Sequence, residues 1–314
     1  NIVSFIFLLR QKRFMWRLKM DSGNIGFVLL CAAFVFVMTP GLAMFYGGLV
    51  RKKNVVNTMM TSIFIIGIGI VMWVLFGYSI SFAPSGNAFI GDFRWLGLEG
   101  VSLTEGYTDD ASIPNMVFSA FQMMFAVITP ALITGAVAGR MKFKSIFVFT
   151  IFWSLIVYYP LAHMVWGQGG LLGADGIGAL DFAGGDVVHI SSGVSALVLC
   201  ILLGKRHDYE HSIYRIHNIP KVVLGASLLM FGWFGFNAGS ALAADGLAAH
   251  AFMTTGVSAA AAMLSWMLCD VIKNKKPTLI GASTGMVAGL VGITPGAGFV
   301  PMWAAVIILS LIHI

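Results

Sequence analysis

NVVNTMMTSIFIIGIGIVMWVLFGYSISFAPSGNAFIG, residues 54–91, runs its whole length without an Asp, Glu, Lys or Arg. An α-helix needs about 20 apolar residues to cross the roughly 30 Å of hydrocarbon in a bilayer. The stretch also lacks the strict alternation of apolar and polar residues that marks a strand of a membrane barrel. It therefore predicts a membrane-spanning helix, because a chain in lipid must satisfy its backbone hydrogen bonds internally.

Seven further stretches without charge fill most of the chain. They cover residues 22–50, 111–139, 145–174, 187–204, 222–244, 246–269 and 277–314. The last is long enough for two helices if it breaks near Thr294-Pro295-Gly296, which brings the expected number to nine. The composition agrees, since 58% of residues are hydrophobic, 10% are charged and the mean hydropathy is +0.89. Because soluble domains carry about a quarter charged residues, we expect an all-α polytopic membrane protein.

The basic residues are concentrated in alternate connections between these stretches. One set of connections carries Arg51, Lys52, Lys53, Arg140, Lys142, Lys144, Lys205, Arg206, Arg215, Lys221, Lys273, Lys275 and Lys276. The other set carries Arg94 and most of the acidic residues. By the positive-inside rule the first set is cytoplasmic, so we expect a multi-pass protein of the cell membrane with its N-terminus outside. This distribution explains the formal net charge of +6 without nucleic acid as a partner.

The two ends of the sequence give separate expectations. Residues 1–19 place five basic residues on the side that should be poor in them, so we interpret this segment as non-native or upstream and Met20 as the start. A signal peptide is disfavoured because the basic residues follow the apolar run instead of preceding it. Ile314 falls within an expected helix. We therefore interpret residues 20–314 as an incomplete membrane domain that lacks its last helices and cytoplasmic tail.

The cysteines and the loop histidines predict no metal site and no cofactor. Each cysteine falls inside a predicted helix, where a packed thiol is the ordinary role; these are Cys31, Cys200 and Cys269. One basic connection also carries three histidines whose spacing suits no ligand set; these are His207, His211 and His217.

One histidine lies at membrane depth, in the run DFAGGDVVHISSG at residues 181–193. An ionisable side chain at a helix centre costs about 2.5–3.5 kcal/mol, so such residues tend to face a cavity, a partner or a translocation path. Gly185, His189 and Gly193 are four residues apart and share one helix face, which predicts space beside the imidazole. The alternative is close helix packing, with the histidine satisfied by a neighbour. An imidazole with an ordinary pKa near 6.5 can accept or relay a proton.

Aromatic residues at helical spacing accompany this histidine. Phe121 and Phe125 lie on one stripe, and Phe236 and Ser240 lie on another. Trp166 closes a third predicted helix, near the outer interface. Each stripe alone is typical of a packed core. Together, aromatic faces and a hydroxyl acceptor can hold ammonium, because a desolvated cation–π contact is worth up to about 2 kcal/mol.

Five runs in order give the chain a family resemblance. They are TPGLAMFYGGLVR at 39–51, AHMVWG at 162–167, GALDFAGG at 178–185, FGWFGFNAGS at 231–240 and GLVGITP at 289–295. The chain resembles the ammonium transporter, methylammonium permease and Rhesus family from about Met20 to Met302. The resemblance implies eleven helices in two inverted five-helix halves plus a final helix, of which this chain would hold eight or nine. It also implies a homotrimer with one pore per subunit.

The resemblance assigns an entrance to this pore. Trp166, Ser240 and Phe125 match the outer ammonium-recruitment site. Phe121 or Phe125 stacked with Phe236 matches the phenylalanine gate below it, and the residues themselves do not decide between the two.

The resemblance also assigns two residues of the fifth helix. His189 matches the first of two pore histidines, and the second would lie beyond Ile314. Asp181 matches the carboxylate that supports the recruitment site, and its position before the helix also predicts an N-cap.

The expected function is transport of ammonium for nitrogen uptake, with methylammonium as a second substrate. Ammonium would be captured outside and deprotonated, and ammonia would pass His189 while the proton either follows by relay or stays outside. The resemblance adds a PII-class regulatory protein as a cytoplasmic partner. An ammonium sensor of the same fold, with little transport, is the alternative, since fold does not settle function.

A remote alternative comes from Gly281-Ala282-Ser283-Thr284-Gly285, which fits the G-x-S-x-G pattern of a serine hydrolase. That nucleophile elbow requires a strand-to-helix turn. Gly281, Gly285 and Gly289 lie four apart and instead indicate a small-residue packing face. An intramembrane serine protease is therefore disfavoured, and we expect no enzymatic activity.

Overall fold

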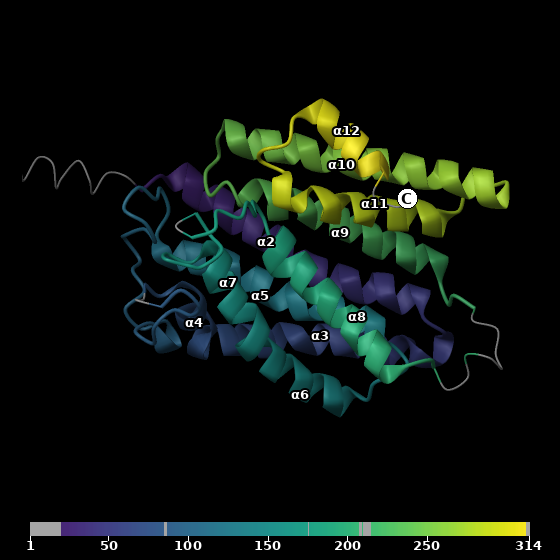
Figure 1. Cartoon of the computed structure of the whole chain (residues 1–314), viewed down its shortest axis with the longest axis horizontal. Helices are drawn as coiled ribbons and strands as arrows, with labels where there is room; N and C mark the ends of the chain where they lie inside the picture. The colour runs from purple at the N-terminus through teal and green to yellow at the C-terminus, as the bar shows by residue number, and fades with distance from the viewer. Residues whose placement is uncertain (1–19, 85–86, 175, 207–208, 210–214, 312–314) are drawn as a thin grey trace, which may run out of the picture.

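The computed structural model describes residues 20–84, 87–174, 176–206, 209 and 215–311, and all regular structure in these residues is helical. Figure 1 shows the helices lying side by side along the long axis of the molecule. Eight of them are long and apolar enough to cross a membrane. The predicted all-helical polytopic fold is therefore confirmed. The segment before Met20 lies outside the described residues.

The helices follow the charge-free stretches closely. The first four spans are α2 (Ser22–Leu49), then α3 (Val55–Met72) continued by η2 (Trp73–Gly77) and α4 (Tyr78–Phe82), then α5 (Asn115–Val137), then α6 (Phe143–Trp153) continued by η4 (Ser154–Tyr158) and α7 (Tyr159–Trp166). The next four are η5 (Gly185–Ile190) continued by α8 (Ser191–Leu203), α9 (Ile219–Gly239), α10 (Gly246–Asn274) and α11 (Leu279–Ile293). The predicted break is present as a 3-10 turn, Thr294–Gly296, before α12 (Met302–Leu311).

Three of these spans contain a π-helical segment, which the sequence did not predict. They are η2, η4 and η5. A π-helical segment shifts the side chains after it around the helix axis, and such segments are frequent at functional sites. In η5 the amides of Val188 and His189 both donate to the carbonyl of Gly184, at 3.0 Å each. This segment therefore sets the direction of the membrane histidine.

Glycines bring α2 and α9 into close contact. A Cβ at Gly225 would lie 2.3 Å from the backbone nitrogen of Phe45, and one at Gly232 would lie 2.2 Å from Met38 Cγ. A Cβ at Gly48 would lie 2.8 Å from the carbonyl of Asn218. Small residues are what helices in a membrane use to bring their backbones together. The α2–α9 pair therefore joins the early and late parts of the bundle.

The connections richest in basic residues meet at one end of the bundle. The amide of Asn218 donates to the carbonyl of Gly48 (3.1 Å), which joins the start of α9 to the end of α2. The guanidinium of Arg140 donates to the carbonyl of Gly204 (2.9 Å) and to that of Ala136, so it caps the ends of α8 and α5. The loop that follows α4 lies at the opposite end (Figure 1). The two sets of connections are thus separated as predicted.

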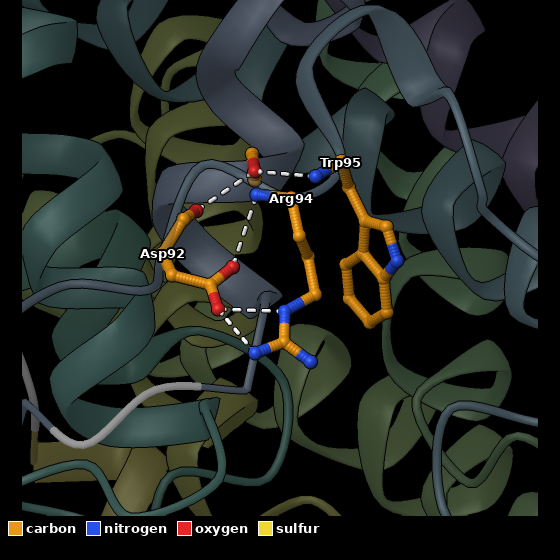
Figure 2. A network of polar contacts seen from close by, with 4 residues as sticks. Asp92, Arg94 and Trp95 are labelled. Carbon is orange, nitrogen blue, oxygen red and sulfur yellow. Dashed lines mark hydrogen bonds and ion pairs between the residues drawn. The ribbon is translucent and has the colours of Figure 1, made fainter.

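The one basic residue in the predicted outer connections is paired with a carboxylate (Figure 2). Arg94 Nε and Nη2 lie 2.6 and 2.5 Å from Asp92 Oδ2, and this guanidinium lowers the pKa of the Asp92 carboxyl below its usual value. Ser79 Oγ donates to the carbonyl of Asp92 (2.8 Å) and accepts from the amide of Trp95 (3.0 Å). The network ties this loop to α4 and leaves little net positive charge there.

Candidate functional site

A cavity of about 440 Å³ opens at the end of the bundle opposite the basic connections. Two helices bring aromatic side chains to it, since α5 supplies Phe121 and Phe125 and α7 ends at Trp166. Ser240, at the end of α9, and Asp181, before η5, complete this part of the lining. The structure therefore brings together every residue that the sequence placed at the entrance, and we call this cavity the vestibule.

Aromatic rings lead from the vestibule into the bundle. Trp166 meets Phe125 edge to face, with ring centroids 5.9 Å apart and an interplanar angle of 87°. Phe125 packs on Phe236 at 4.4 Å and 38°, and Phe236 stacks on His189 at 5.9 Å and 20°. Trp166, Phe125, Phe236 and His189 thus form one continuous ring series across four elements. We call these four residues the ring series.

The structure distinguishes the two phenylalanines that the sequence left as alternatives. Phe125 contacts both Trp166 and Phe236. Phe121 lies one turn earlier on α5, and its ring contacts Phe125 at 5.0 Å. Phe125 and Phe236 are both buried, at 1% and 0% exposure. The pair of rings in contact at the floor of the vestibule is therefore Phe125 with Phe236, tilted by 38° instead of stacked, and Phe121 lies beside Phe125.

His189 is held by aromatic stacking. Its ring lies 5.3 Å from that of Trp233 at an angle of 23°. Its Nε2 is buried and has no hydrogen-bond partner among the described residues. Trp233 Nε1 in turn donates to Thr294 Oγ1 at 2.9 Å, which fixes the indole against the break after α11. The imidazole is thus oriented by rings while one nitrogen stays available, which does not agree with a histidine satisfied by a polar neighbour.

The two glycines that flank His189 differ in their surroundings. Gly193 is exposed, and a Cβ there would meet none of the described atoms within 4 Å, so this position is an open helix surface and does not show space beside the imidazole. A Cβ at Gly185 would lie 2.3 Å from Pro295 Cβ. The prediction of space was therefore wrong at Gly185, because the turn after α11, distant in sequence, packs on that glycine.

The Asp181 carboxylate caps the start of the histidine-bearing helix. Oδ1 accepts from the amides of Gly184 (2.6 Å) and Gly185 (2.7 Å), and Oδ2 accepts from those of Asp186 (2.8 Å) and Val187 (3.1 Å). An anion at a helix N-terminus is stabilised by these amides and by the helix dipole. The Asp181 side chain thus caps the first amides of this helix as predicted, although the N-cap position itself is occupied by Gly184. The backbone carbonyl of Asp181 also accepts from Trp166 Nε1 (3.0 Å), so one residue positions both the helix and the indole.

Ser240 offers a hydroxyl acceptor at the vestibule. Its Oγ donates to the carbonyl of Phe236 at 2.9 Å. Because a hydroxyl carries one hydrogen and two lone pairs, this bond leaves the lone pairs to accept from a ligand. Across the cavity, Tyr107 Oη accepts from the amide of Gln168 (3.1 Å), and burial raises the pKa of this phenol to about 12. The vestibule thus presents aromatic faces and hydroxyl oxygens, and the carboxyl residues Asp110 and Asp181 also line it.

Sequence reasoning missed two residues that complete this site. Trp233 stands three residues before Phe236 in the run FGWFGF, so it shares the helix face of that ring. This spacing could have predicted that Trp233 lies beside Phe236 in the site. Thr294 was read as part of a helix break, and only the folded structure shows that its hydroxyl anchors the indole.

The serine pattern lies within a helix. Ser283 is in α11, which runs without interruption from Leu279 to Ile293, and no strand precedes it in the described part of the chain. A Cβ at Gly285 would lie 2.8 Å from the carbonyl of Ala262, and one at Gly289 would lie 2.5 Å from that of Ser258. The glycines form a packing face against α10, and the nucleophile elbow is absent there. Within the described ranges no three His, Cys, Asp or Glu side chains are grouped to hold a metal ion.

Comparisons with known proteins agree with this geometry. Residues 26–310 match the model of the Ammonium Transporter Family. An ammonium transporter of Bacillus subtilis is 53% identical over 92% of this chain and 70% of its own length, and one of Mycobacterium bovis is 45% identical over 91% and 64%. The crystal structure of Saccharomyces cerevisiae Mep2 superposes with a TM-score of 0.85 at 38% identity, over 94% of this chain and 66% of that one. A structure named as a sensor Amt protein gives 0.83 at 29% identity, over 92% and 72%. The chain thus spans about two thirds of these relatives.

Proposed function

This chain belongs to the ammonium transporter family, and from that premise we propose that the protein carries ammonium nitrogen across the cell membrane. The observation that supports this most is the ring series, which leads from the vestibule to a buried imidazole with an unpartnered nitrogen. A core packed only for stability would satisfy a buried polar nitrogen. A conduction path needs such a group to remain available.

Capture occurs in the vestibule. The faces of Trp166 and Phe125 attract the cation through their ring quadrupoles, and such contacts strengthen as water leaves. Ser240 Oγ accepts one of the four N–H donors of ammonium. The Asp181 carboxylate does not bind ammonium directly, because both its oxygens accept hydrogen bonds from backbone amides. It therefore positions Trp166 and the helix of His189.

Passage requires the Phe125–Phe236 pair to part. These rings are buried and 4.4 Å apart at their centroids, so a hydrated ion cannot pass them as they stand. Ammonium differs from potassium in that it can give up a proton and continue as neutral ammonia. Deprotonation of ammonium gives ammonia and one proton. The ammonia moves past the ring of His189, and the proton either stays on the outer side or follows through the imidazole.

The assembly and its setting follow the family. We propose a homotrimer in the plasma membrane, with the N-terminus outside and a PII-class protein bound on the cytoplasmic face. The support for the orientation is the gathering of basic connections at one end of the bundle. No enzymatic step belongs to this proposal, and methylammonium is the second expected substrate.

The proposal is tested by adding ammonium to proteoliposomes that contain the protein while charge movement and internal pH are followed together. A saturable current specific to ammonium and methylammonium indicates electrogenic transport, and a pH change without current indicates ammonia conduction. Saturable ammonium binding without either signal, from well-folded protein, would favour the sensor and contradict transport.

A further inference from the structure

Gln122 is a buried carboxamide of α5 that no part of the proposed path yet uses. Its side chain is 8% exposed and lines the vestibule. It lies on the same helix face as Phe118, Phe121 and Phe125, which line the cavity at the spacing of successive turns. Its Oε1 is buried and has no hydrogen-bond partner among the described residues.

The neighbouring polar residues of α5 do have hydrogen-bond partners, so the missing partner is particular to Gln122. Ser119 Oγ accepts from Trp73 Nε1 at 3.2 Å. Asn115 Oδ1 accepts from the hydroxyl of Tyr78. A buried carbonyl oxygen left without a donor costs about 1–3 kcal/mol. The Gln122 carboxamide therefore carries a free-energy cost of folding that Ser119 and Asn115 do not carry. Such a cost is expected of a group whose hydrogen bond is made by a ligand.

Two other oxygen-bearing residues of the vestibule, Asp181 and Tyr107, already accept hydrogen bonds from the protein, while Thr108, Asp110, Ser112 and Ser240 also line the cavity. Each oxygen of Asp181 accepts two backbone amides. Tyr107 Oη accepts from the amide of Gln168. Ser240 Oγ keeps its lone pairs after donating to Phe236. Ammonium carries four N–H donors, and the Ser240 hydroxyl together with the rings of Trp166 and Phe125 satisfies only part of them.

We propose that Gln122 Oε1 accepts a hydrogen bond from the ammonium ion in the vestibule and so contributes to its capture. The inference rests on the proposed function, because it names a further ligand of the same site. In chemical terms Gln122 supplies a neutral amide oxygen beside the aromatic side chains of α5. It thereby replaces a water that the ion must lose before it reaches Phe125 and Phe236.

The test compares Gln122→Leu with Gln122→Glu in purified protein. The leucine variant removes the acceptor at similar volume, and the half-saturating ammonium concentration for transport should rise about tenfold, the equivalent of one hydrogen bond to a charged group. The glutamate variant keeps an oxygen at this position and should saturate at or below the wild-type concentration. Both are also measured by the ammonium-dependent rise in the unfolding midpoint in detergent, against sodium at equal ionic strength.

Ser119→Ala is the matched control, because it removes a satisfied hydroxyl from the same helix. It should lower the unfolding midpoint and leave half-saturation unchanged. Gln122→Leu should leave the unfolding midpoint unlowered, since it removes no hydrogen bond between described residues, and should raise the half-saturating ammonium concentration.

Two results would overturn the inference. One is an unchanged half-saturation in Gln122→Leu while the wild type transports normally, which leaves the proposed function intact. The other is a wild type with neither saturable transport nor ammonium-specific stabilisation, in which case the proposed function and the inference fail together.

Discussion

Two spans of this molecule carry glycines on one helix face, four residues apart in α11 and eight apart in η5–α8, and they use them in different ways. In α11, Gly281, Gly285 and Gly289 all press against side chains or backbone of α10. In the span η5–α8, Gly185 packs on Pro295, whereas Gly193 has nothing within 4 Å. Midway between those two glycines lies His189, whose Nε2 has no hydrogen-bond partner within the described part of the chain.

The difference shows that glycine spacing alone does not separate packing from a path. Both helices begin at a polar cap, since Thr278 Oγ1 accepts from the amide of Gly281 (2.9 Å) much as Asp181 accepts at η5. The distinction lies in what the glycines flank. Those of α11 admit a neighbouring helix, and those of η5–α8 flank an ionisable ring that faces aromatic partners. Substitutions at the glycines, at His189 and at Asp181 separate these two uses.

His189→Ala should affect transport most. If the imidazole handles the proton, transport should fall by at least about 100-fold, the range of a positioned acid or base. The measurement is the initial rate of ammonium-driven charge movement in proteoliposomes. His250→Gln is the control, because His250 Nε2 already contacts the carbonyl of Val300 at 3.0 Å outside the ring series. Equal rates in the wild type and His189→Ala would remove this histidine from the mechanism.

Gly289→Val should affect stability most. The added side chain would enter a space where the carbonyl of Ser258 already lies 2.5 Å from a Cβ position. Overpacking of this kind costs about 1–3 kcal/mol, so the unfolding midpoint in detergent should fall clearly. An unaltered midpoint would mean that α10 and α11 are not packed through their glycines.

Asp181→Ala should have an intermediate effect on both properties. It removes the acceptor of four backbone amides, and loss of an N-cap costs about 0.5–2 kcal/mol. The unfolding midpoint should fall by less than in Gly289→Val, and ammonium capture should weaken because Trp166 loses a rigid anchor. Asp181→Asn keeps one oxygen acceptor and should lie between the alanine variant and the wild type. A midpoint in Asp181→Ala equal to the wild-type value would contradict the cap.

Gly193→Ala should have the smallest effect. The position is helical and open, and alanine is favoured over glycine within a helix by about 0.5–1 kcal/mol. The unfolding midpoint should therefore stay level or rise slightly, whereas Gly285→Ala should lower it. A fall in Gly193→Ala as large as in Gly285→Ala would abolish the distinction between the two helices.

The sequence predicts the spans and the break at Thr294 because both follow from local composition. It also predicts the Asp181 cap, since a cap depends on the next few residues alone. It does not choose between Phe121 and Phe125, because both lie on one face of α5 and only the position of Phe236 on α9 decides. For the same reason it misses Pro295 against Gly185. These are contacts between segments distant in the sequence, and no local pattern encodes them.

We propose that the ring series from Trp166 to His189 conducts ammonium nitrogen. An ammonium pulse on proteoliposomes of the wild type and of His189→Ala, with charge movement and internal pH recorded together, decides this. We expect a saturable, ammonium-specific signal in the wild type, and in His189→Ala the charge movement should be lost or the ratio of charge movement to pH change should differ. An identical signal in both proteins, or no signal from well-folded wild type, would show that the ring series does not conduct ammonium nitrogen.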